Sequence, residues 1–510
     1  MKLIRLTEQE YKKIGDKRFC LVEKSPSYLK ELSSLYSVFE RLDSIVDDNP
    51  RNQGIWDYSR HSIEVQPLSA LRNMDFQDTV IVITSDYYKE YFEKIQLLLG
   101  DRDMDVYFFP NQETAYELEY REKYADSKLQ DILVFRSGPH ASGYVRGMDF
   151  DDNARALFEY ALSLGLNDKY ELVWIVKNPE EFKKYSAYNN VSFLPFDGSV
   201  SENKAVRDDY YRVLCLAKFF FFTDAYGFVR NCREDQVRVQ LWHGSVVKKR
   251  LSPLPCKSRY EYMTVTGEFF AKLCAEEFGL EDSQMLVTGL PKMDWLFEQD
   301  QSVFEKLGLK KTDKTIFWMP TYRFSEKRMN KPIDGVLNEE TGLPLLKDRG
   351  ELEQINRILE ERNILLIIKL HPFQDKSVVH TEGLSNIVLL DNEALYEQGI
   401  QINRILGMAD ALISDYSSSA IDFLILDRPI AILVDDVEDY SESRGYLFDN
   451  ILEALPGTLI SDLCGLERFI EEIAEGHAPD KEKRGLLLER YHKYKDNLSS
   501  KRVLEALKII

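Results

Sequence analysis

The segment between Ala409 and Leu426 constrains the fold of this chain more than any other stretch. Ala409 to Ile413 is an apolar run typical of a buried strand, and Ala420 to Leu426 has the apolar spacing of a buried helix. Small polar residues fill the turn between them, and such residues leave the first amides of a helix open to an anion. The pattern predicts a phosphate-binding cradle at the carboxyl edge of a parallel sheet, with an ordinary helix N-cap as the alternative. The candidate ligands in this turn are Ser414, Asp415, Ser417 and Ser418.

Length and charge bound the class of protein. A chain of 510 residues predicts two or three domains with large cores. The net charge of −20 argues against a general nucleic-acid binder and against broad adhesion to anionic lipid, although a local basic patch would still attract a membrane. No apolar run approaches the ~20 residues of a membrane span, and the region after Met1 lacks the apolar centre of a signal peptide. The six cysteines include no Cys-x-x-Cys pair, which argues against zinc and disulfide frameworks and predicts a reduced, cytoplasmic protein.

The first part of the chain, residues 1–129, is predicted to be a small accessory α/β domain. Apolar runs alternate there with helix-like stretches, a rhythm that implies a small parallel sheet. Glu23 to Ser27 stands where a dinucleotide-binding domain would have a glycine-rich turn, so its side chains would keep a pyrophosphate at a distance. We therefore expect a module for acceptor recognition or self-association, joined to the rest by a charged helix at Tyr116 to Asp126. The predicted strands and helices are Phe19–Val22, Ser27–Tyr36, Ser44–Val46, Val80–Ile83, Tyr87–Leu99 and Val106–Phe109.

Two further α/β units are predicted, at residues 130–256 and 257–510. Val213 to Phe222, the longest apolar stretch, is interpreted as a buried strand with its flanks. The same strand–helix rhythm in both units predicts two doubly wound domains that face each other across a cleft. The second unit is expected to contain strands Ile132–Phe135, Leu172–Val176, Phe219–Phe222 and Val237–Leu241 and a helix at Asn153–Leu164. In the third unit, strands are expected near Met263, Met285, Ile316, Leu365, Ile387, Ala411 and Ala431.

Five polar clusters follow predicted strands and would therefore lie at carboxyl edges, where doubly wound sheets bind their ligands. They are Trp242–Ser245, Thr288–Asp294, Met319–Arg323, Lys369–Pro372 and Arg444–Asp449. In this order they resemble the CDP-glycerol glycerophosphotransferase family, whose members build teichoic-acid-like polyol phosphate polymers. The resemblance covers about residues 131–510, because Tyr494–Asp496 and Lys501–Val503 fit the family's last helix. It implies the GT-B architecture, in which two Rossmann-like domains face each other.

Two histidines are candidate catalytic residues. His243 precedes Gly244, which leaves its imidazole room to reach a ligand. An imidazole with an ordinary pKa of about 6.5 takes a proton from a hydroxyl near neutral pH, so His243 is the candidate base. The resemblance implies that His371 contacts the phosphates of the donor or orients the base. The alternative for both residues is a packed or capping histidine.

The donor is expected mainly in the third unit. The turn at Ser414 to Ser418 would hold its pyrophosphate, and the helix dipole would add partial positive charge. Thr321 and Arg323 are candidates for a second phosphate clamp, and Asp449 for hydrogen bonds to ribose or polyol hydroxyls. Three residues complete the predicted site: Gly289 beside the donor, and Gly244 and Lys248 beside an anionic acceptor.

The implied reaction is phosphoryl transfer. An acceptor hydroxyl attacks the β-phosphorus of CDP-glycerol or CDP-ribitol and CMP leaves, with no cofactor and a metal ion only optional. The acceptor would be a teichoic acid, a capsular glycan or a lipid-linked sugar. The alternatives are a GT-B glycosyltransferase that uses a nucleotide sugar, and a non-catalytic assembly protein. Modest basic clusters at Lys481–Arg484 and Lys493–Arg502 predict at most weak peripheral attachment to the inner face of the membrane.

Overall fold

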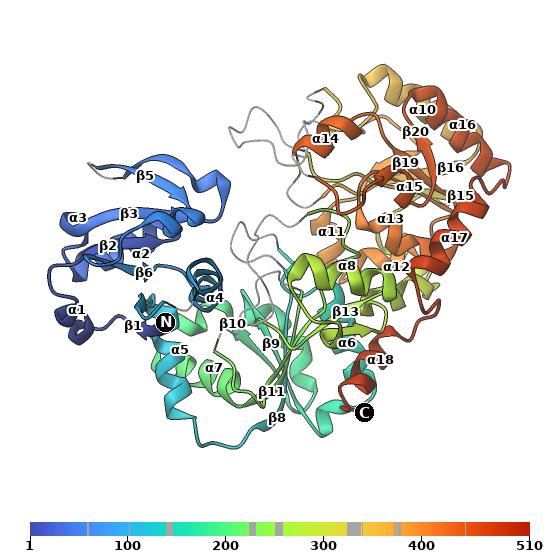
Figure 1. Ribbon diagram of the computed structural model, residues 1–510. Helices are drawn as coiled ribbons and strands as arrows, with labels where there is room; N and C mark the ends of the chain where they lie inside the picture. The colour runs from blue at the N-terminus through green and yellow to red at the C-terminus, as the bar shows by residue number, and fades with distance from the viewer. Residues whose placement is uncertain are drawn as a thin grey trace.

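The chain folds into three α/β units, each built around its own sheet (Figure 1). The computed structural model describes residues 1–58, 61–100, 102–138, 146–223, 231–249, 259–323, 338, 340–371, 374, 379–443 and 445–510. In Figure 1 the first unit, in blue, lies to one side of the second, and the third, in orange and red, lies on the other side. Within the described ranges, no helix has both the length and the apolar character needed to cross a membrane.

The first sheet has seven strands in the order β1-β7-β6-β2-β3-β5-β4. Neighbouring strands in this sheet pair in parallel, except β4 and β5, which form an antiparallel hairpin. The strands are β1 (Lys2–Arg5), β2 (Arg18–Val22), β3 (Leu42–Asp47), β4 (Gly54–Tyr58), β5 (His61–Pro67), β6 (Thr79–Ile83) and β7 (Asp105–Phe108). The helices are α1 (Glu8–Ile14), α2 (Pro26–Leu35), α3 (Val38–Arg41), α4 (Tyr88–Leu99) and α5 (Gln112–Lys123), with short 3-10 helices at η1 (Pro50–Asn52) and η2 (Leu68–Asn73).

The apolar runs of the first unit form strands as predicted, whereas its polar strands were missed. Val80 to Ile83 is buried and lies within β6, as its continuous apolar character indicates. By contrast, β4 is mostly exposed, with Ile55 72% exposed, and its residues lack the pattern of a buried strand. Strand β1 is short and half polar, which also hides it from sequence analysis.

The first unit docks on the second through a buried polar interface. The guanidinium of Arg259 donates from Nε to Glu90 of α4 at 2.8 Å, and their side chains are only 3% and 9% exposed. The Tyr88 hydroxyl donates to the Asn231 side chain at 2.5 Å, and Asn231 also donates to Glu117 of α5. Buried polar groups with matched partners fix one orientation of the two units, because a shifted interface would leave them unpaired.

The second sheet contains seven parallel strands in the order β10-β9-β8-β11-β12-β13-β14. The strands are β8 (Gln130–Arg136), β9 (Glu171–Val176), β10 (Val191–Pro195), β11 (Ala217–Phe222), β12 (Val237–Gln240), β13 (Tyr262–Val265) and β14 (Met285–Val287). The helices are α6 (Asp152–Ser163), η3 (Leu166–Asp168), η4 (Pro179–Ala187), η5 (Phe196–Val200), α7 (Lys204–Leu216), α8 (Glu268–Phe278), η6 (Asp282–Gln284) and η7 (Pro291–Phe297).

Two expectations about this unit differ from the structure. Strands β13 and β14 belong to the second sheet, so the second unit does not end at residue 256. The sequence keeps the same strand–helix rhythm across that point, and rhythm alone does not show which sheet a strand joins. The apolar stretch Val213 to Phe222 divides between the last four residues of α7 and the whole of β11, because a buried helix end and a buried strand are equally apolar.

The third sheet contains six parallel strands in the order β17-β16-β15-β18-β19-β20. Strand order reverses between β15 and β18, which is where a doubly wound sheet opens a ligand-binding crevice. The strands are β15 (Lys314–Met319), β16 (Ile364–Ile368), β17 (Ile387–Leu389), β18 (Ala411–Ser414), β19 (Ile430–Leu433) and β20 (Thr458–Ile460). The helices are α9 (Ser302–Lys306), α10 (Arg349–Glu361), α11 (Asn392–Glu397), α12 (Ile402–Leu406), α13 (Ser418–Phe423), η9 (Leu424–Leu426), α14 (Val437–Ser443), α15 (Ile451–Ala454), α16 (Leu463–Ala474), α17 (Lys481–Tyr491) and α18 (Ser499–Ala506).

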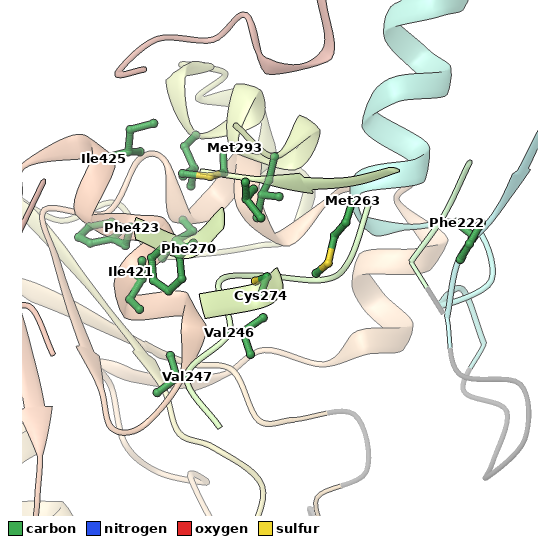
Figure 2. Packing of buried hydrophobic residues seen from close by; sticks show 14 of the residues in the cluster. Phe222, Val246, Val247, Met263, Phe270, Cys274, Met293, Ile421, Phe423 and Ile425 are labelled. Carbon is green, nitrogen blue, oxygen red and sulfur yellow. The ribbon is translucent and has the colours of Figure 1, made fainter. Parts of the chain in front are cut away.

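The second and third units share one continuous apolar core. Phe270 of α8 lies beside Ile421 and Phe423 of α13, with Val246 and Val247 in the same cluster (Figure 2). The C-terminal helix α18 returns to the second unit and packs on α6 and η7 (Figure 1). A shared core of this kind fixes the junction between the two units, since separating them would expose apolar surface to water.

Candidate active site

The turn after β12 carries His243, and side-chain hydrogen bonds from Gln240 and Asn153 hold its main chain in place. Gln240 accepts from the Trp242 main-chain N–H at 2.8 Å, and Asn153 donates to the Trp242 carbonyl at 2.9 Å. Trp242 has φ of +54°, a left-handed conformation that costs energy for a bulky residue and that surrounding contacts must impose. The Trp242 and His243 rings stack with centroids 4.4 Å apart. The turn therefore presents the imidazole in one fixed place.

His243 is exposed to solvent, yet protein surrounds it on most sides. This surrounding protein lowers the pKa of His243 below its ordinary value of 6.5, because it disfavours the charged imidazolium. Asp152 opposes the effect, and Lys292 and Lys248 reinforce it. A hydrogen bond between the ring and the main chain of Thr223 orients the imidazole. The ring is consequently neutral near pH 7 and can accept a proton, as the sequence predicts for a base.

Gly244 brings the His243 turn against the start of α13. A Cβ atom at Gly244 would lie 2.5 Å from the Ser418 hydroxyl oxygen, closer than real Cβ atoms approach. The φ of +149° at Gly244 is also one that other residues rarely adopt. The structure thus brings together the predicted base of the second unit and the predicted phosphate cradle of the third.

The serine-rich turn after β18 combines a helix cap with accessible hydroxyls. Ser417 is the N-cap of α13, and its hydroxyl accepts from the Ser419 main-chain N–H at 3.3 Å. Ser414 is buried and donates to the Met319 carbonyl at 3.0 Å, which ties the end of β18 to β15. Ser417, Ser418 and Ser419 are half-buried, and the Ser419 hydroxyl donates to that of Ser417 at 2.8 Å. The helix starts at Ser418, two residues before the predicted start, and gives way to a 3-10 turn at Leu424.

Asp415, Thr321 and Arg323 form a buried network and do not point free groups at a ligand. Asp415 is fully buried and accepts from the Thr321 N–H at 3.0 Å and the Thr321 hydroxyl at 2.9 Å. Arg323 is 4% exposed and pairs with Asp415 at 3.0 Å and with Asp436 at 2.9 Å. Burial alone would lower the pKa of Arg323, but these carboxylates outweigh it. The expected second phosphate clamp therefore differs from the structure, where these groups join the ends of β15, β18 and β19.

His371 lies near His243 and Lys248. It is exposed to solvent and its ring centroid lies 5.7 Å from that of Tyr322. The surrounding protein lowers its pKa to about 4, and the nearby charges of Lys248, Lys369 and His243 act in the same direction. A neutral His371 can donate or accept a hydrogen bond at a phosphate but brings no positive charge to it.

Lys248 belongs to the segment of residues 247–249, here called the strap, which pairs with residues 445–447 of the third unit. It pairs with Tyr446 in an antiparallel bridge, and the Leu447 N–H donates to the Val247 carbonyl at 3.0 Å. Its ammonium lies 5.0 Å from the centroid of the Tyr440 ring. The strap thus holds a cation beside both histidines, as the pKa shifts of the two rings also indicate.

Gly289 packs against the C-terminal helix. Gly289 has φ of +81°, and a Cβ atom there would collide with the hydroxyl of Ser499 in α18. It therefore gives room to the C-terminal helix, whose first amides are capped by the Asp294 carboxylate at 2.8 Å. Asp449 is exposed in the turn before α15. Sequence analysis placed Gly289 beside the donor because it lies in a polar cluster after a strand. Its contact with Ser499 could not be predicted, because the two residues are distant in sequence.

The sequence analysis missed the residues that hold the His243 turn in place through hydrogen bonds and ion pairs. They are Asp152, Asn153, Lys292 and Asp422. Lys292 lies within a polar cluster that was singled out, but its spacing gave no sign that it reaches His243. Asp152 has φ of +59°, an unusual backbone conformation that no sequence pattern announces.

Two doubly wound units that share one core, with a histidine turn of one against a helix start of the other, have the GT-B architecture. The profile of one family, "CDP-Glycerol:Poly(glycerophosphate) glycerophosphotransferase", matches residues 141–508. The chain belongs to this family and is an enzyme of it, a CDP-polyol-dependent transferase of polyol phosphate.

Characterised relatives and a solved structure agree with this membership. The teichoic acid ribitol-phosphate primase of Bacillus spizizenii is 26% identical over 317 residues, which are 58% of this chain and 74% of the relative. The teichoic acid glycerol-phosphate primase of Bacillus subtilis is 28% identical over 311 residues, 58% of this chain and 72% of the relative. The solved structure of the wall teichoic acid polymerase TagF matches with a TM-score of 0.59 at 17% identity, over 83% of this chain and 97% of that one, and shows the same fold.

Proposed function

We propose that this enzyme moves glycerol phosphate or ribitol phosphate from its CDP-polyol to a hydroxyl of a teichoic-acid, glycan or lipid-linked acceptor. The observation that carries the proposal is the contact between the His243 turn and the start of α13, where Gly244 has no room for a Cβ atom beside Ser418. Phosphoryl transfer needs a base close to the groups that bind the phosphate. This contact would place His243 next to the hydroxyls at the start of α13.

The proposed chemistry follows from the position of the groups. The neutral imidazole of His243 takes the proton of the acceptor hydroxyl, whose oxygen then attacks the β-phosphorus, and the bond to CMP breaks. Hydroxyls of Ser417 and Ser418 and the first amides of α13 would bind the phosphate oxygens. Lys248 would attract the negative charge of donor and acceptor from the strap. His371 would donate a hydrogen bond to a phosphate oxygen. That a metal ion is optional stays a prediction.

A panel of donors tests the proposal. Purified protein is incubated with an acceptor and with CDP-glycerol, CDP-ribitol or UDP-hexoses, and the released nucleotide is identified. We expect CMP from one or both CDP-polyols and no UDP. Release of UDP would instead favour a nucleotide-sugar transferase, and no release from any donor would favour an assembly protein. The matched relatives include both a ribitol-phosphate and a glycerol-phosphate primase, so the panel must contain both polyols.

Membrane attachment stays a proposal of weak peripheral binding. The basic residues of the two predicted C-terminal clusters lie largely in ion pairs. Lys493 pairs with Glu268 at 2.7 Å and Lys495 with Glu489 at 2.8 Å. Arg484 is fully buried. Cations neutralised in this way contribute little attraction to anionic lipid, so sedimentation with anionic vesicles should recover only a minor part of the protein.

A further inference from the structure

A largely buried lysine joins the His243 turn to both units. Lys292 belongs to η7, and its side chain is 13% exposed. Its ammonium donates to the main-chain carbonyl of His243 at 2.7 Å. It also lies 3.4 Å from the carboxylate of Asp152 and 3.5 Å from that of Asp422. The ammonium therefore makes one hydrogen bond and two ion pairs.

The two carboxylates come from different units. Asp152 lies at the first turn of α6 in the second unit, and Asp422 lies on α13 in the third unit. The helix that carries Asp422 also begins with Ser418, the residue against which Gly244 packs. Lys292 is therefore a direct link between the turn that carries the base and the helix that would bind the donor.

Asn153 completes the support of the turn. Its side-chain oxygen accepts from the Lys292 main-chain N–H at 2.9 Å, and its amide donates to the Trp242 carbonyl at 2.9 Å. Consecutive carbonyls of Trp242 and His243 are therefore held by Asn153 and Lys292. Trp242 and Asp152 both have positive φ, at +54° and +59°, and strained residues of this kind persist only where their surroundings over-determine them.

We propose that Lys292 is a positioning residue for the transfer reaction, which fixes the imidazole of His243 relative to the start of α13. This inference rests on the proposed function of His243 as the base. The Lys292 side chain is only 13% exposed and its charge is balanced by Asp152 and Asp422, so it presents little positive charge to a phosphate. Lys292 therefore acts through His243 and does not bind the donor.

The charge of Lys292 is maintained by its partners. Burial would lower the pKa of Lys292, but Asp152 and Asp422 outweigh burial and raise it. A buried ionic cluster costs desolvation energy and is weak evidence for stability, so its value here lies in the geometry that it imposes. If the two units moved apart, Asp422 would leave Lys292 and the support of the turn would be lost. The same link thus makes the position of the base depend on closure of the two units.

Charged and titratable groups face His243 from each element around it: Asp152 of α6, Lys292 of η7, Lys248 of the strap and His371 after β16. Burial lowers the pKa of His243 most, Asp152 raises it and Lys292 lowers it further. Removing Lys292 should therefore raise the pKa of the base, and removing the charge of Asp152 should lower it. The acid limb of kcat/KM should move to higher pH in Lys292→Met and to lower pH in Asp152→Asn. A purely structural defect would not shift the two limbs in opposite directions.

The test compares Lys292→Met and Lys292→Arg with Lys204→Met, a surface lysine that pairs with Asp208 on α7. Measurements are kcat and kcat/KM from CMP release with acceptor present, the Kd of CDP-glycerol or CDP-ribitol from calorimetry, and the melting temperature. Misplacing a catalytic group by about 1 Å costs ~10²-fold, so we expect that loss in kcat for Lys292→Met. Its donor Kd should stay within ~3-fold of wild type, because the lost interaction acts on the base and not on the nucleotide. Lys292→Arg should recover part of the rate since it keeps the charge, and Lys204→Met should match wild type.

The outcomes separate this inference from the proposed function. If the wild-type protein releases no CMP from any CDP-polyol, the proposed function fails and the inference fails with it. If wild type turns over and Lys292→Met keeps its kcat, the inference alone is overturned. It is also overturned if Lys292→Met weakens donor binding as much as it lowers kcat, or if the two acid limbs move together. If Lys292→Met does not fold, Asp422→Asn provides the test: a loss confined to kcat supports the inference, and wild-type kcat overturns it.

Discussion

The carboxyl edges of the first and third sheets are built from similar polar residues but leave different groups available. In the first sheet, Asp47 is fully buried and accepts from the Lys24 N–H at 2.8 Å, the Asn49 N–H at 2.7 Å and the Asn52 amide at 2.9 Å. In the third sheet, the turn of residues 417–419 leaves three half-buried hydroxyls at a helix start. The first edge satisfies its amides with carboxylates, which only accept, whereas the turn at the third sheet satisfies one amide with the Ser417 hydroxyl and offers hydroxyls, which can donate to an anion.

At the carboxyl edge of the first sheet, carboxylates of the protein itself accept hydrogen bonds from the surrounding main-chain and side-chain donors. Asp86 accepts from the Tyr28 hydroxyl at 2.6 Å and from the Asn111 amide at 2.8 Å. Glu23 follows β2 with φ of +77°, and burial raises its pKa to about 7. Carboxylates thus accept the hydrogen bonds that phosphates would take in a dinucleotide-binding domain. We therefore expect the donor to bind only at the edge that offers hydroxyl donors.

Replacement of His243 by alanine should have the largest effect. A general base typically contributes ~10²–10⁴-fold to the rate, so we expect that loss in CMP release while calorimetry shows unchanged donor affinity. His477→Ala is the matched control, because this exposed histidine lies far along the chain beside Glu475. Wild-type turnover by a folded His243→Ala protein would end the assignment of the base.

Crowding the serine turn should affect the donor. In Ser417→Leu/Ser418→Leu, two hydroxyls are lost and a large side chain meets the Gly244 turn. Hydrogen bonds to charged groups are worth ~1.5–3 kcal/mol, so CDP-glycerol or CDP-ribitol should bind ~10- to 100-fold more weakly by calorimetry.

The corresponding change at the first sheet sharpens the comparison. Ser25 and Ser27 lie in the turn after β2, at the same kind of position. Ser25→Leu/Ser27→Leu should leave donor affinity unchanged, because the first edge is closed by Asp47 and Asp86. If this variant lost affinity and the α13 variant did not, the two edges would have the opposite roles.

Removing the carboxylate of Asp47 should affect stability and not donor binding. Asp47→Ala leaves the half-buried main-chain amides of Lys24 and Asn49 without an acceptor, which costs ~1–3 kcal/mol. Chemical unfolding measures the loss, with the exposed Asp103→Ala as control. An unfolding free energy equal to that of wild type, or weakened donor affinity in the folded variant, would contradict the structural role of this edge.

The smallest predicted effect is in the pH profile. His243 must be neutral to accept a proton, and burial lowers its pKa below 6.5. The pKa of His371 is lowered to about 4, so it stays neutral across the same range. The acid limb of kcat/KM should therefore lie below pH 6.5, measured with acceptor present. A limb above that value would mean that a different group, or a His243 that favours its charged form, controls the rate.

Much of the fold could be predicted from the sequence because strands and helices rest on local patterns, and the rule that ligands bind beyond the carboxyl ends of parallel strands placed His243 and the serine turn at one cleft. The five consecutive apolar residues Ile364–Ile368 form β16, where the sequence predicts a strand near Leu365. The roles of Arg323 and Gly289 could not be predicted from the sequence, because the residues that they contact are distant along the chain. Asp436, for example, is 113 residues from Arg323. Lys292 was within a recognised cluster, but its contact with His243 depends on how two units pack.

Amide hydrogen exchange with and without a CDP-polyol tests the central comparison most directly, because it reports both edges in one experiment. The account predicts that CDP-glycerol or CDP-ribitol slows exchange at residues 414–421 and 242–249. Residues 22–28, 47–53 and 84–88, at the carboxyl edge of the first sheet, should exchange at the same rate with and without the donor. Protection confined to the first sheet, with no change at residues 414–421, would contradict the account.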